Sequence, residues 1–144
     1  MRPGRQEDFE FARRLYFSSM KPLLEALDAW NPEEKDAAFK SYFDVDEIRI
    51  IMLNGKDVGW IQVSHTEKEF CLDQVHLLEC ARDQGIGTTL IKDTIAEAAA
   101  HNKNVSLSLV KGNRAIRLYE RLGFRRVAED STKIHKRFVT NQIH

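Results

Sequence analysis

Residues 82–91 read RDQGIGTTLI and follow the mostly apolar segment 75–78. Glycine has no Cβ, so the backbone N–H groups of a glycine-rich turn can close around an oxyanion. The helix that is expected to begin at Gly85 adds unpaired N–H donors and a partial positive charge at its N-terminus. This turn between a strand and a helix is therefore predicted to bind a phosphate or pyrophosphate group.

The composition predicts one folded domain without a charged macromolecular partner. The chain has 144 residues, of which 42% are hydrophobic and 31% charged, as in soluble globular domains. The formal net charge is zero, so the total charge points to neither nucleic acid nor a membrane. Residues 23–48 carry eight acidic and two basic side chains, and residues 101–144 carry ten basic and three acidic ones. The two segments are either binding surfaces for oppositely charged ligands or solvated surfaces that balance each other.

Cys71 and Cys80 are the only cysteines. Neither has the cysteine or histidine neighbours of a zinc site, so no metal is expected and both are predicted to be partly buried thiols. The chain has no secretory leader and no apolar run of about 20 residues, which predicts a cytoplasmic location in a reducing compartment.

The first third of the chain predicts two helices. Apolar side chains recur with a helical period over residues 7–27, where Pro22 is expected to interrupt or reorient the helix. Asn31 and Pro32 fit the N-cap and first position of a second helix that runs to about residue 42. The aromatic residues near this helix are expected to pack the two helices together; they are Trp30, Phe39, Tyr42 and Phe43.

The remainder predicts a mixed α/β domain whose front half is largely antiparallel. Asn54-Gly55 indicates a hairpin between strands 48–53 and 58–63, and a further strand covers 70–78. A helix over 85–101 and a strand over 105–110 follow. Asn113 can cap the next helix and Gly123 can end it, before two strands over 124–128 and 133–139. Three polar residues in the last strand are expected to form a solvated face: Lys133, His135 and Lys136.

Three families of phosphate-binding turn can be compared with residues 82–91. A Walker loop needs a lysine followed by serine or threonine after its second glycine, whereas Gly87 is followed by two threonines. A dinucleotide-binding turn needs a third glycine where Leu90 stands, and an acidic residue after the next strand, which ends in Ser-Leu-Val. Residues 82–91 are therefore neither a Walker loop nor a dinucleotide-binding turn.

Residues 82–91 match the third family of phosphate-binding turn. Arg82-x-x-Gly85-x-Gly87 resembles the (Gln/Arg)-x-x-Gly-x-(Gly/Ala) signature of the GCN5-related N-acetyltransferase (GNAT) superfamily. Residues 113–124, NRAIRLYERLGF, resemble nearly in full the second conserved block of that family, in the same order and at a matching spacing. The resemblance covers residues 48–138 well and the N-terminal helices loosely.

The resemblance implies a single-domain α/β fold of the acyl-CoA N-acyltransferase type, with a mixed central sheet and a splayed strand pair at the cofactor site. One N-acetyltransferase domain would cover residues 1–144. Its first strand would be short or missing, with residues 2–3 as its remnant.

The implied co-substrate is acetyl-CoA. The turn would wrap the pyrophosphate. The pantetheine arm would be bound by the backbone of Leu77 and Leu78 and by the side chain of Asn113. Tyr119 would lie near the thioester sulfur. Each assignment has a structural alternative, because glycines shape tight turns, asparagines cap helices and tyrosines pack in cores. The implied cofactor-binding residues are Leu77, Leu78, Arg82, Asp83, Gln84, Gly85, Ile86, Gly87, Thr88, Thr89, Asn113 and Tyr119.

The chemistry requires an acid and a base. Tyr119 can protonate the departing thiolate, and a backbone N–H near Leu77 can stabilise the oxyanion. Asp73 is the first candidate base, because a carboxylate on an otherwise apolar strand is costly unless it has a partner or a task. It can also be a substrate ligand or a surface carboxylate. His76, on the other face of the strand, is the second candidate.

These residues predict transfer of an acetyl group from acetyl-CoA to a primary amine of a small molecule or peptide, by direct attack in a ternary complex. Trp30, Tyr42 and Asp73 are candidates for contacting that acceptor, and the acidic segment 23–48 favours a cationic one. A non-catalytic acyl-CoA-binding module and a donor with a longer acyl chain are the alternatives. Dimers are common in this family, and the last strand offers an edge for a homodimer by that analogy.

Overall fold

The computed structural model describes residues 1–140 of the chain. The backbone forms two compact units. The N-terminal unit comprises Met1–Gln62 and Gln74–Ala81, and the C-terminal unit comprises Val63–Asp73 and the residues from Arg82 on. Within the described residues, no helix has the length and apolar character needed to cross a bilayer.

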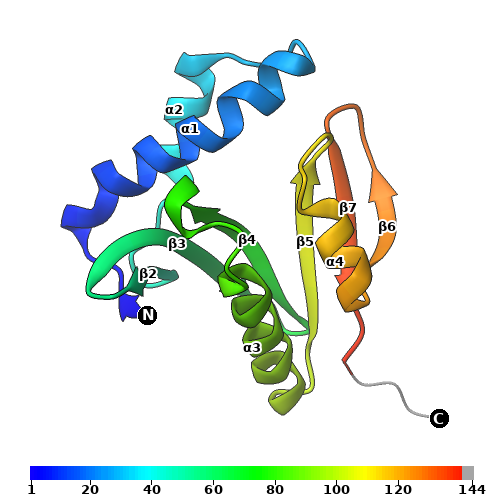
Figure 1. Ribbon diagram of the computed structural model, residues 1–144. Helices are drawn as coiled ribbons and strands as arrows, with labels where there is room; N and C mark the ends of the chain where they lie inside the picture. Colours follow the sequence, from blue (N-terminus) through cyan, green and yellow to red (C-terminus); the bar gives the residue numbers. More distant parts are fainter. Residues whose placement is uncertain (141–144) are drawn as a thin grey trace. The chain divides into compact units, whose positions relative to one another are not determined.

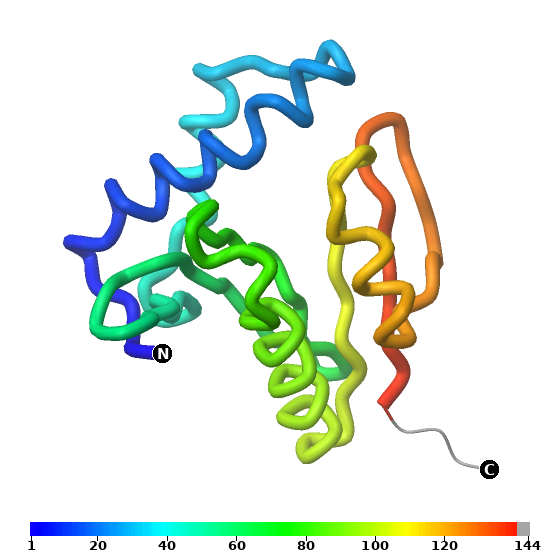
Figure 2. The backbone as a smooth tube through the Cα atoms, in the orientation of Figure 1, coloured from blue at the N-terminus to red at the C-terminus, as the bar shows by residue number. Residues whose placement is uncertain are grey.

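The N-terminal unit is built from two helices and the first strands. α1 (Phe9–Ala26) and α2 (Pro32–Tyr42) form a helical hairpin, drawn as the blue and cyan coils of Figures 1 and 2. β1 (Arg2–Pro3) pairs antiparallel with β2 (Ile48–Leu53), which pairs antiparallel with β3. The remaining elements that contribute to this unit are η1 (Gln6–Asp8), most of β3 (Lys56–His65), the end of β4 (Glu69–Leu77) and η2 (Glu79–Ala81).

Pro22 lies inside α1, and the helix continues past it to Ala26. The prediction that this proline interrupts the helix is therefore wrong. A proline removes one backbone hydrogen bond, but the turns on either side keep theirs. Leu15 before Pro22 and Leu24 after it are both buried, so packing of the apolar side of the helix offsets the lost bond.

The helix cap and the hairpin turn that the sequence predicts in this unit are confirmed. The Asn31 side chain accepts a hydrogen bond from the Glu34 N–H at 3.1 Å, and Pro32 is the first residue of α2. Asn54 and Gly55 both have positive φ, 53° and 79°, as a two-residue hairpin turn of type I′ requires. The turn joins Leu53 to Lys56 in the β2–β3 register.

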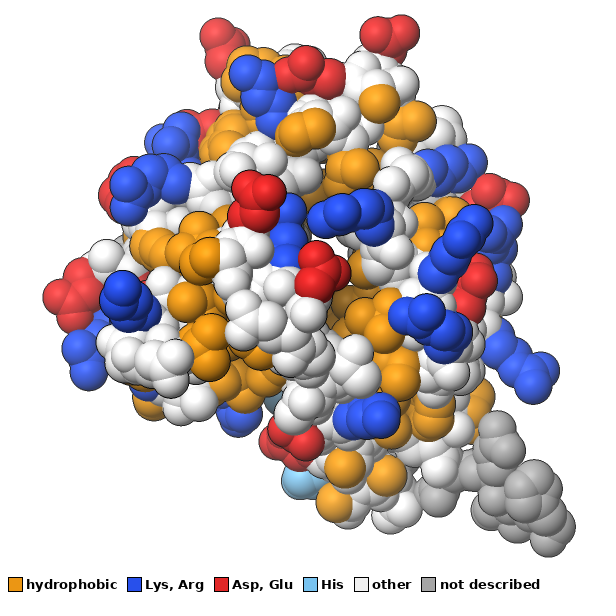
Figure 3. All heavy atoms as spheres, in the orientation of Figure 1, with side chains coloured by type: hydrophobic (Ala, Val, Ile, Leu, Met, Phe, Trp, Pro, Cys, Tyr) orange, Lys and Arg blue, Asp and Glu red, His pale blue; other side chains and the backbone are white. Residues whose placement is uncertain are grey.

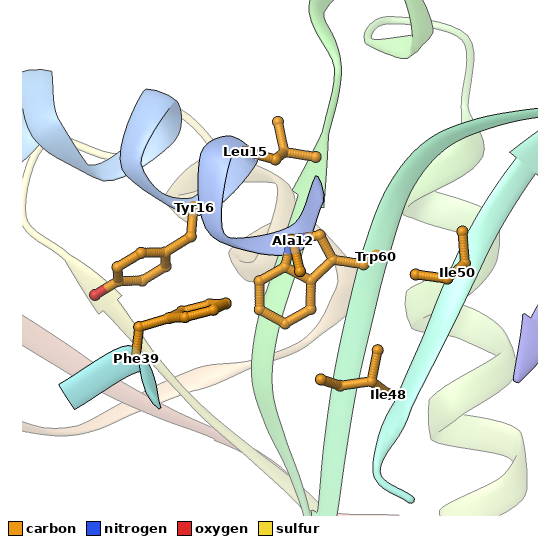
Figure 4. Close-up of a cluster of buried hydrophobic side chains, with 7 residues drawn as sticks. All are labelled: Ala12, Leu15, Tyr16, Phe39, Ile48, Ile50 and Trp60. Carbon is orange, nitrogen blue, oxygen red and sulfur yellow. The ribbon is translucent and has the colours of Figure 1, made fainter. Parts of the chain in front are cut away.

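A cluster of buried aromatic and aliphatic side chains fills the N-terminal unit (Figure 4). Trp60 of β3 is fully buried, and its ring meets that of Phe39 at 5.9 Å, nearly edge to face. Trp30 packs edge-on against Phe17, as expected of a residue between the two helices. Tyr42 does not join them: it is 74% exposed, because α2 ends at this residue with the side chain outside the cluster.

The C-terminal unit contains α3 (Ile86–Ala100), β5 (Asn104–Val110), α4 (Ile116–Leu122), β6 (Arg125–Glu129) and β7 (Lys133–Phe138), together with the start of β4. β4 pairs parallel with β5, whereas β5–β7 and β7–β6 are antiparallel. The hydrogen-bonded order over the whole chain is β1-β2-β3-β4-β5-β7-β6, so the predicted mixed sheet is confirmed. In Figure 1, α4 lies in front of the β5–β7 pair.

The two faces of this part of the sheet differ in polarity. Leu107 and Leu109 of β5 and Ile134 of β7 are buried on one face. Their neighbours along the strands, including Ser108 and His135, point to the opposite face, because side chains alternate along a strand.

Lys136 lies on the buried face, and the expectation that it is solvated is wrong. Its side chain is 1% exposed, and Nζ donates to Glu120 Oε1 of α4 at 3.0 Å. Lys136 pairs with Leu107 across the sheet, so its aliphatic stem is buried while its ammonium reaches the edge of the helix. Lys133 is exposed and His135 is partly buried.

α4 ends as predicted. Gly123 has φ of 108°, in the left-handed region. The Phe124 N–H donates to the Tyr119 carbonyl at 3.0 Å, and the Gly123 N–H donates to the Glu120 carbonyl at 3.1 Å. These are the two bonds of a Schellman motif. Phe124 is buried against Tyr119, which ties the end of α4 to the sheet.

Candidate active site

The predicted phosphate-binding turn opens α3 in the C-terminal unit. Asp83 and Gly85 have positive φ, 61° and 77°, and Gly85 is the N-cap. The first helical bond runs from the Thr89 N–H to the Gly85 carbonyl at 3.0 Å. The N–H groups of Ile86, Gly87 and Thr88 therefore precede the regular helical bonding and point out of the helix end, where an anion can bind them.

Gly87 has no structural reason to be glycine in the described part of the chain. A Cβ built on it meets nothing within 4 Å, and its φ is not positive. A glycine that neither the backbone nor the packing requires is typical of a place where a ligand approaches the main chain. This observation favours the ligand-binding interpretation of the turn over the purely structural one.

Asn113 follows β5 and sits before α4. Its Oδ1 accepts the Ala115 N–H at 2.8 Å, and its carbonyl accepts the Ile116 N–H at 3.2 Å. The helix begins at Ile116, so the asparagine caps the approach to α4 rather than the first turn. Because the cap uses Oδ1, the Nδ2 donors remain for another partner.

Tyr119 is buried at 5% exposure on the inner side of α4, with its ring edge-on to Phe124 at 5.4 Å. Burial raises the pKa of Tyr119 to about 12, because the phenolate would lose its hydration. The side chain is therefore a protonated phenol at neutral pH. A phenol that keeps its proton can serve as a general acid.

Asp73 ends the part of β4 that belongs to the C-terminal unit. Its side chain is exposed, so the expected desolvation cost of a carboxylate on an apolar strand does not arise. Cys71, two residues earlier on the same face, is half-buried and accepts a hydrogen bond from Ser106 at 3.5 Å. Cys80 is exposed, contrary to the expectation of a partly buried thiol, because it lies in the short turn η2.

Leu77 and Leu78 belong to the N-terminal unit. The Leu78 N–H donates to the Val58 carbonyl at 2.7 Å, and its carbonyl accepts the Ala81 N–H at 2.9 Å. The backbone of Leu78 is thus engaged by β3 and η2. Leu77, the preceding residue, is the last residue of β4.

β3 approaches this segment closely at Gly59. A Cβ at Gly59 would overlap the carbonyl oxygen of His76 and come within 2.8 Å of the Leu77 side chain. Only glycine fits there, so the position of Leu77 depends on the missing side chain of Gly59.

His76 is packed within the N-terminal unit. It is 7% exposed, its ring lies 5.1 Å from that of Trp60, and the Tyr16 ring meets it edge-on at 5.7 Å. Nε2 is bonded to Gln74 Oε1 at 2.6 Å. These contacts favour a packing role for His76 over the role of a base.

A polar network that the sequence analysis did not single out lies on the open face of the C-terminal sheet. Ser108 Oγ is 2.6 Å from His135 Nδ1, and His135 Nε2 is 3.3 Å from Asp130 Oδ2. The alternation of serine with apolar residues in β5 was the available signal, because it places Ser106 and Ser108 on one face. The pairing with His135 depends on the β5–β7 register, which no local pattern reveals.

The predicted site residues therefore divide between the two units. The turn Arg82–Thr89, Asn113, Tyr119 and Asp73 belong to the C-terminal unit. Leu77, Leu78, Trp30 and Tyr42 belong to the N-terminal unit.

Solved structures similar to this chain share the whole fold at low sequence identity. The PH1933 protein of Pyrococcus horikoshii superposes with a TM-score of 0.74 at 17% identity, over 99% of this chain and 96% of that one. The PaiA N-acetyltransferase of Thermoplasma acidophilum, solved with coenzyme A, has a TM-score of 0.73 at 14% identity, over 96% of both chains. A GNAT acetyltransferase of Elizabethkingia anophelis with acetyl-CoA bound has a TM-score of 0.58 at 18% identity, over 76% of this chain and 83% of that one.

The comparison with curated proteins finds no match. Residues 44–126, more than half of the chain, match the family model of the acetyltransferase (GNAT) domain. That segment contains both the turn that opens α3 and the block around Tyr119. The chain therefore belongs to the GNAT family of acetyl-CoA-dependent acetyltransferases.

Proposed function

We propose that the protein is an N-acetyltransferase that moves the acetyl group of acetyl-CoA to a primary amine of a small molecule or peptide, by direct attack in a ternary complex. The observation that carries this proposal is the position of Tyr119, a phenol buried on α4 in the C-terminal unit that also holds the glycine turn. A binding module needs only the glycine turn, whereas thioester cleavage needs a group that still holds its proton when the thiolate leaves.

The donor half of the proposal rests on the C-terminal unit. The N–H groups at the start of α3 would bind the pyrophosphate, with Arg82–Thr89 wrapped around it, and Asn113 Nδ2 would donate to the pantetheine arm. Figure 3 shows Lys and Arg side chains over α4 and β6, and residues 101–140 carry far more basic than acidic groups. A positive surface supports an anionic donor such as a CoA thioester.

The reaction needs a neutral amine. Its nitrogen attacks the thioester carbon, and the carbonyl oxygen becomes an oxyanion that a backbone N–H at Leu77 would stabilise. Collapse of that intermediate breaks the C–S bond, and Tyr119 gives its proton to the departing sulfur. Asp73, exposed in the middle of β4, would meet the incoming amine as a base or as a ligand of its ammonium form.

For the acceptor we propose a cationic amine. Within the acidic segment, Asp36 is paired with Arg13 at 2.6 Å and with Lys40 at 3.2 Å, whereas Glu33 and Glu34 are exposed at the start of α2. Trp30 and Tyr42 lie within this segment and would contribute aromatic surface. Exposed carboxylates and aromatic rings are suited to ammonium groups.

The test is acetylation of a panel that contains spermidine, glucosamine, an unacetylated peptide and neutral or anionic amines. Release of the CoA thiol and the mass of the product would be followed together. Turnover of the cationic members supports the proposal, and turnover of only neutral or anionic ones contradicts the acceptor class.

The alternative is a non-catalytic acyl-CoA-binding module. A thermal-shift titration separates it from an enzyme, since a ligand at 100 times its dissociation constant adds about 2.7 kcal/mol to the free energy of unfolding. Stabilisation by acetyl-CoA without turnover of any amine would favour the binding module.

A further inference from the structure

Ser108, His135 and Asp130 form a connected polar chain within the C-terminal unit. Ser108 and His135 are directly paired in the β5–β7 register, and Asp130 lies in the turn that joins β6 to β7. The distances are 2.6 Å from Ser108 Oγ to His135 Nδ1, and 3.3 Å from His135 Nε2 to Asp130 Oδ2. Ser108 and His135 lie on the face of the sheet opposite the buried side chains Leu107 and Ile134, and Asp130 reaches His135 from the turn.

The direction of the hydrogen bonds follows from Asp130. Its Oδ1 accepts the backbone N–H groups of Thr132 at 2.9 Å and Lys133 at 2.7 Å. These bonds, with a smaller contribution from His135, lower the pKa of Asp130 to about 2, so it is a carboxylate at neutral pH. A carboxylate only accepts, so Nε2 of neutral His135 carries the hydrogen and Nδ1 accepts one from Ser108 Oγ. The hydroxyl oxygen keeps lone pairs for a further donor.

Ser108 lies near the carboxyl end of the parallel β4–β5 strand pair. The β4–β5 register runs to Leu72 with Leu107, and the next residues on the two strands are Asp73 and Ser108. Both are exposed and both follow residues of the buried face. Ligands of α/β sheets bind beyond the carboxyl ends of parallel strands. The β5 strand also leads directly to Asn113, one of the proposed donor-binding residues.

We propose that Ser108 is a catalytic residue that takes the proton of the acceptor amine, with His135 and Asp130 as positioning residues that carry the proton on. This inference rests on the proposed acetyl transfer to an amine. As the amine nitrogen bonds to the thioester carbon, an N–H proton moves to Ser108 Oγ and the Ser108 hydroxyl proton moves to His135 Nδ1. The product is an imidazolium beside the Asp130 carboxylate. Its proton passes to water, because the His135 side chain is 35% exposed. Asp73 then orients the acceptor amine and does not act as the base.

Other charged groups on the same face of β7 flank His135. Lys133 and Arg137 are its neighbours two residues away on the strand, and Arg137 is paired with Glu69 of β4 at 3.1 Å. Asp130 faces His135 from the turn, and Ser108 faces it from β5. The carboxylate of Asp130 is the one charge bonded directly to the imidazole among the described residues, so it is the group that stabilises the imidazolium.

The test compares Ser108→Ala, His135→Gln and Asp130→Asn with Ser106→Ala as a matched control on the same strand and face. Acetyl-CoA is the donor, and spermidine, glucosamine and an unacetylated peptide are the acceptors. We expect Ser108→Ala to lower kcat by roughly 10²–10⁴-fold, while KM for acetyl-CoA and the activity of Ser106→Ala stay unchanged. Equal activity of wild type and Ser108→Ala would overturn the inference.

The pH profile separates positioning from a purely structural role. His135→Gln should abolish the acidic limb of kcat/KM, because the proton-carrying imidazole is gone. Asp130→Asn should move that limb to lower pH, because loss of the negative charge favours the neutral imidazole. An acidic limb that is unchanged in both variants would contradict the relay.

Two measurements without an acceptor complete the test. Nitrogen-15 NMR should find the His135 hydrogen on Nε2, and a hydrogen on Nδ1 would overturn the direction of the relay. Mass spectrometry after incubation with acetyl-CoA should find no acetyl ester on Ser108, since an ester would make the serine a nucleophile instead. If wild type turns over none of the three amines, the proposed cationic acceptor is overturned, and this result differs from turnover that Ser108→Ala leaves intact.

Discussion

The two units place histidine side chains in opposite environments, one buried and one partly exposed. His76 in β4 is buried at 7% exposure between Trp60 and Tyr16. His135 in β7 is half-exposed between Ser108 and Asp130. Both are strand histidines, and only the surroundings that the fold supplies distinguish them. A histidine on an apolar face is held as part of the core, whereas one on an open face can exchange protons.

The tyrosines of the two units are alike, whereas the glycines differ. Tyr16 and Tyr119 are both buried, and burial raises the pKa of each. Gly59 is required by a close strand contact, whereas nothing in the described residues requires Gly87. The packing of the N-terminal unit thus requires Gly59, whereas Gly87 stays available for the ligand-binding role proposed for the C-terminal unit.

The largest expected effect separates the two tyrosines. Tyr119→Phe should lower kcat by roughly 10–10⁴-fold with little change in acetyl-CoA affinity, because only the proton of the general acid is lost. Tyr16→Phe is the matched control and should leave kcat unchanged. Steady-state kinetics and calorimetric titration with acetyl-CoA measure both. Equal losses of kcat in the two variants would show that Tyr119 has no role that Tyr16 lacks.

The second prediction compares the glycines. Gly59→Ala should lower the free energy of unfolding by about 1–3 kcal/mol, because its methyl group would collide with the His76 carbonyl. Gly87→Ala, near the start of a helix and in open space, should keep or raise stability by up to about 1 kcal/mol. Acetyl-CoA affinity should fall in Gly87→Ala, since the methyl group occupies the approach to the N–H groups.

Urea unfolding and calorimetry measure the two quantities separately. A Gly87→Ala protein that binds acetyl-CoA as tightly as wild type would show that this glycine serves the turn alone.

The third prediction concerns the stability role of the histidines. His76→Ala should destabilise the protein by about 1–3 kcal/mol, because it leaves a gap among aromatic rings and removes the partner of Gln74. His135→Ala should change the free energy of unfolding by less than about 0.5 kcal/mol. Chemical denaturation at neutral pH gives both values, and a larger loss for His135→Ala would reverse the comparison.

The smallest effect is a pH dependence. The folded state holds the pKa of Asp130 at about 2, below its ordinary value of 3.8. Its contribution to stability is therefore complete above about pH 4 and is lost as the pH falls toward 2. Asp8, bonded to Arg2, contributes in the same direction from the N-terminal unit. The unfolding midpoints of wild type and Asp130→Asn should converge as the pH falls from about 4 to 2. A constant difference between them would contradict a stabilising role of the Asp130 carboxylate.

The features that were predictable from sequence depend on a few neighbouring residues. The Asn31 cap, the Asn54-Gly55 hairpin and the Gly123 helix end each satisfy backbone groups within about five positions. The glycine turn before α3 and the block around Tyr119 are local in the same sense, and together they indicated the family. Short-range hydrogen bonding and positive φ leave a mark on the residues themselves.

The predictions from sequence that proved wrong concern mainly the burial of side chains. Lys136 was expected in solvent and Tyr42 among the packed aromatic residues, and each lies in the opposite environment. For Asp73, exposure agrees with the surface-carboxylate alternative. Pro22 was expected to interrupt or reorient the helix, and α1 is not interrupted there, with buried leucines on either side of the proline. Whether a side chain is covered depends on elements far away in the chain, such as α4 over Lys136.

The sequence by itself thus determined the order of the elements, their caps and turns, and the family to which the chain belongs. Only the tertiary structure decided which side chains are covered and which meet across strands. Ser108, His135 and Asp130 are separated by up to 27 positions, and β5–β7 pairing brings them within hydrogen-bond distance. Local signals arise from backbone bonds between near neighbours, whereas a constellation of this kind exists only once the register of distant strands is set.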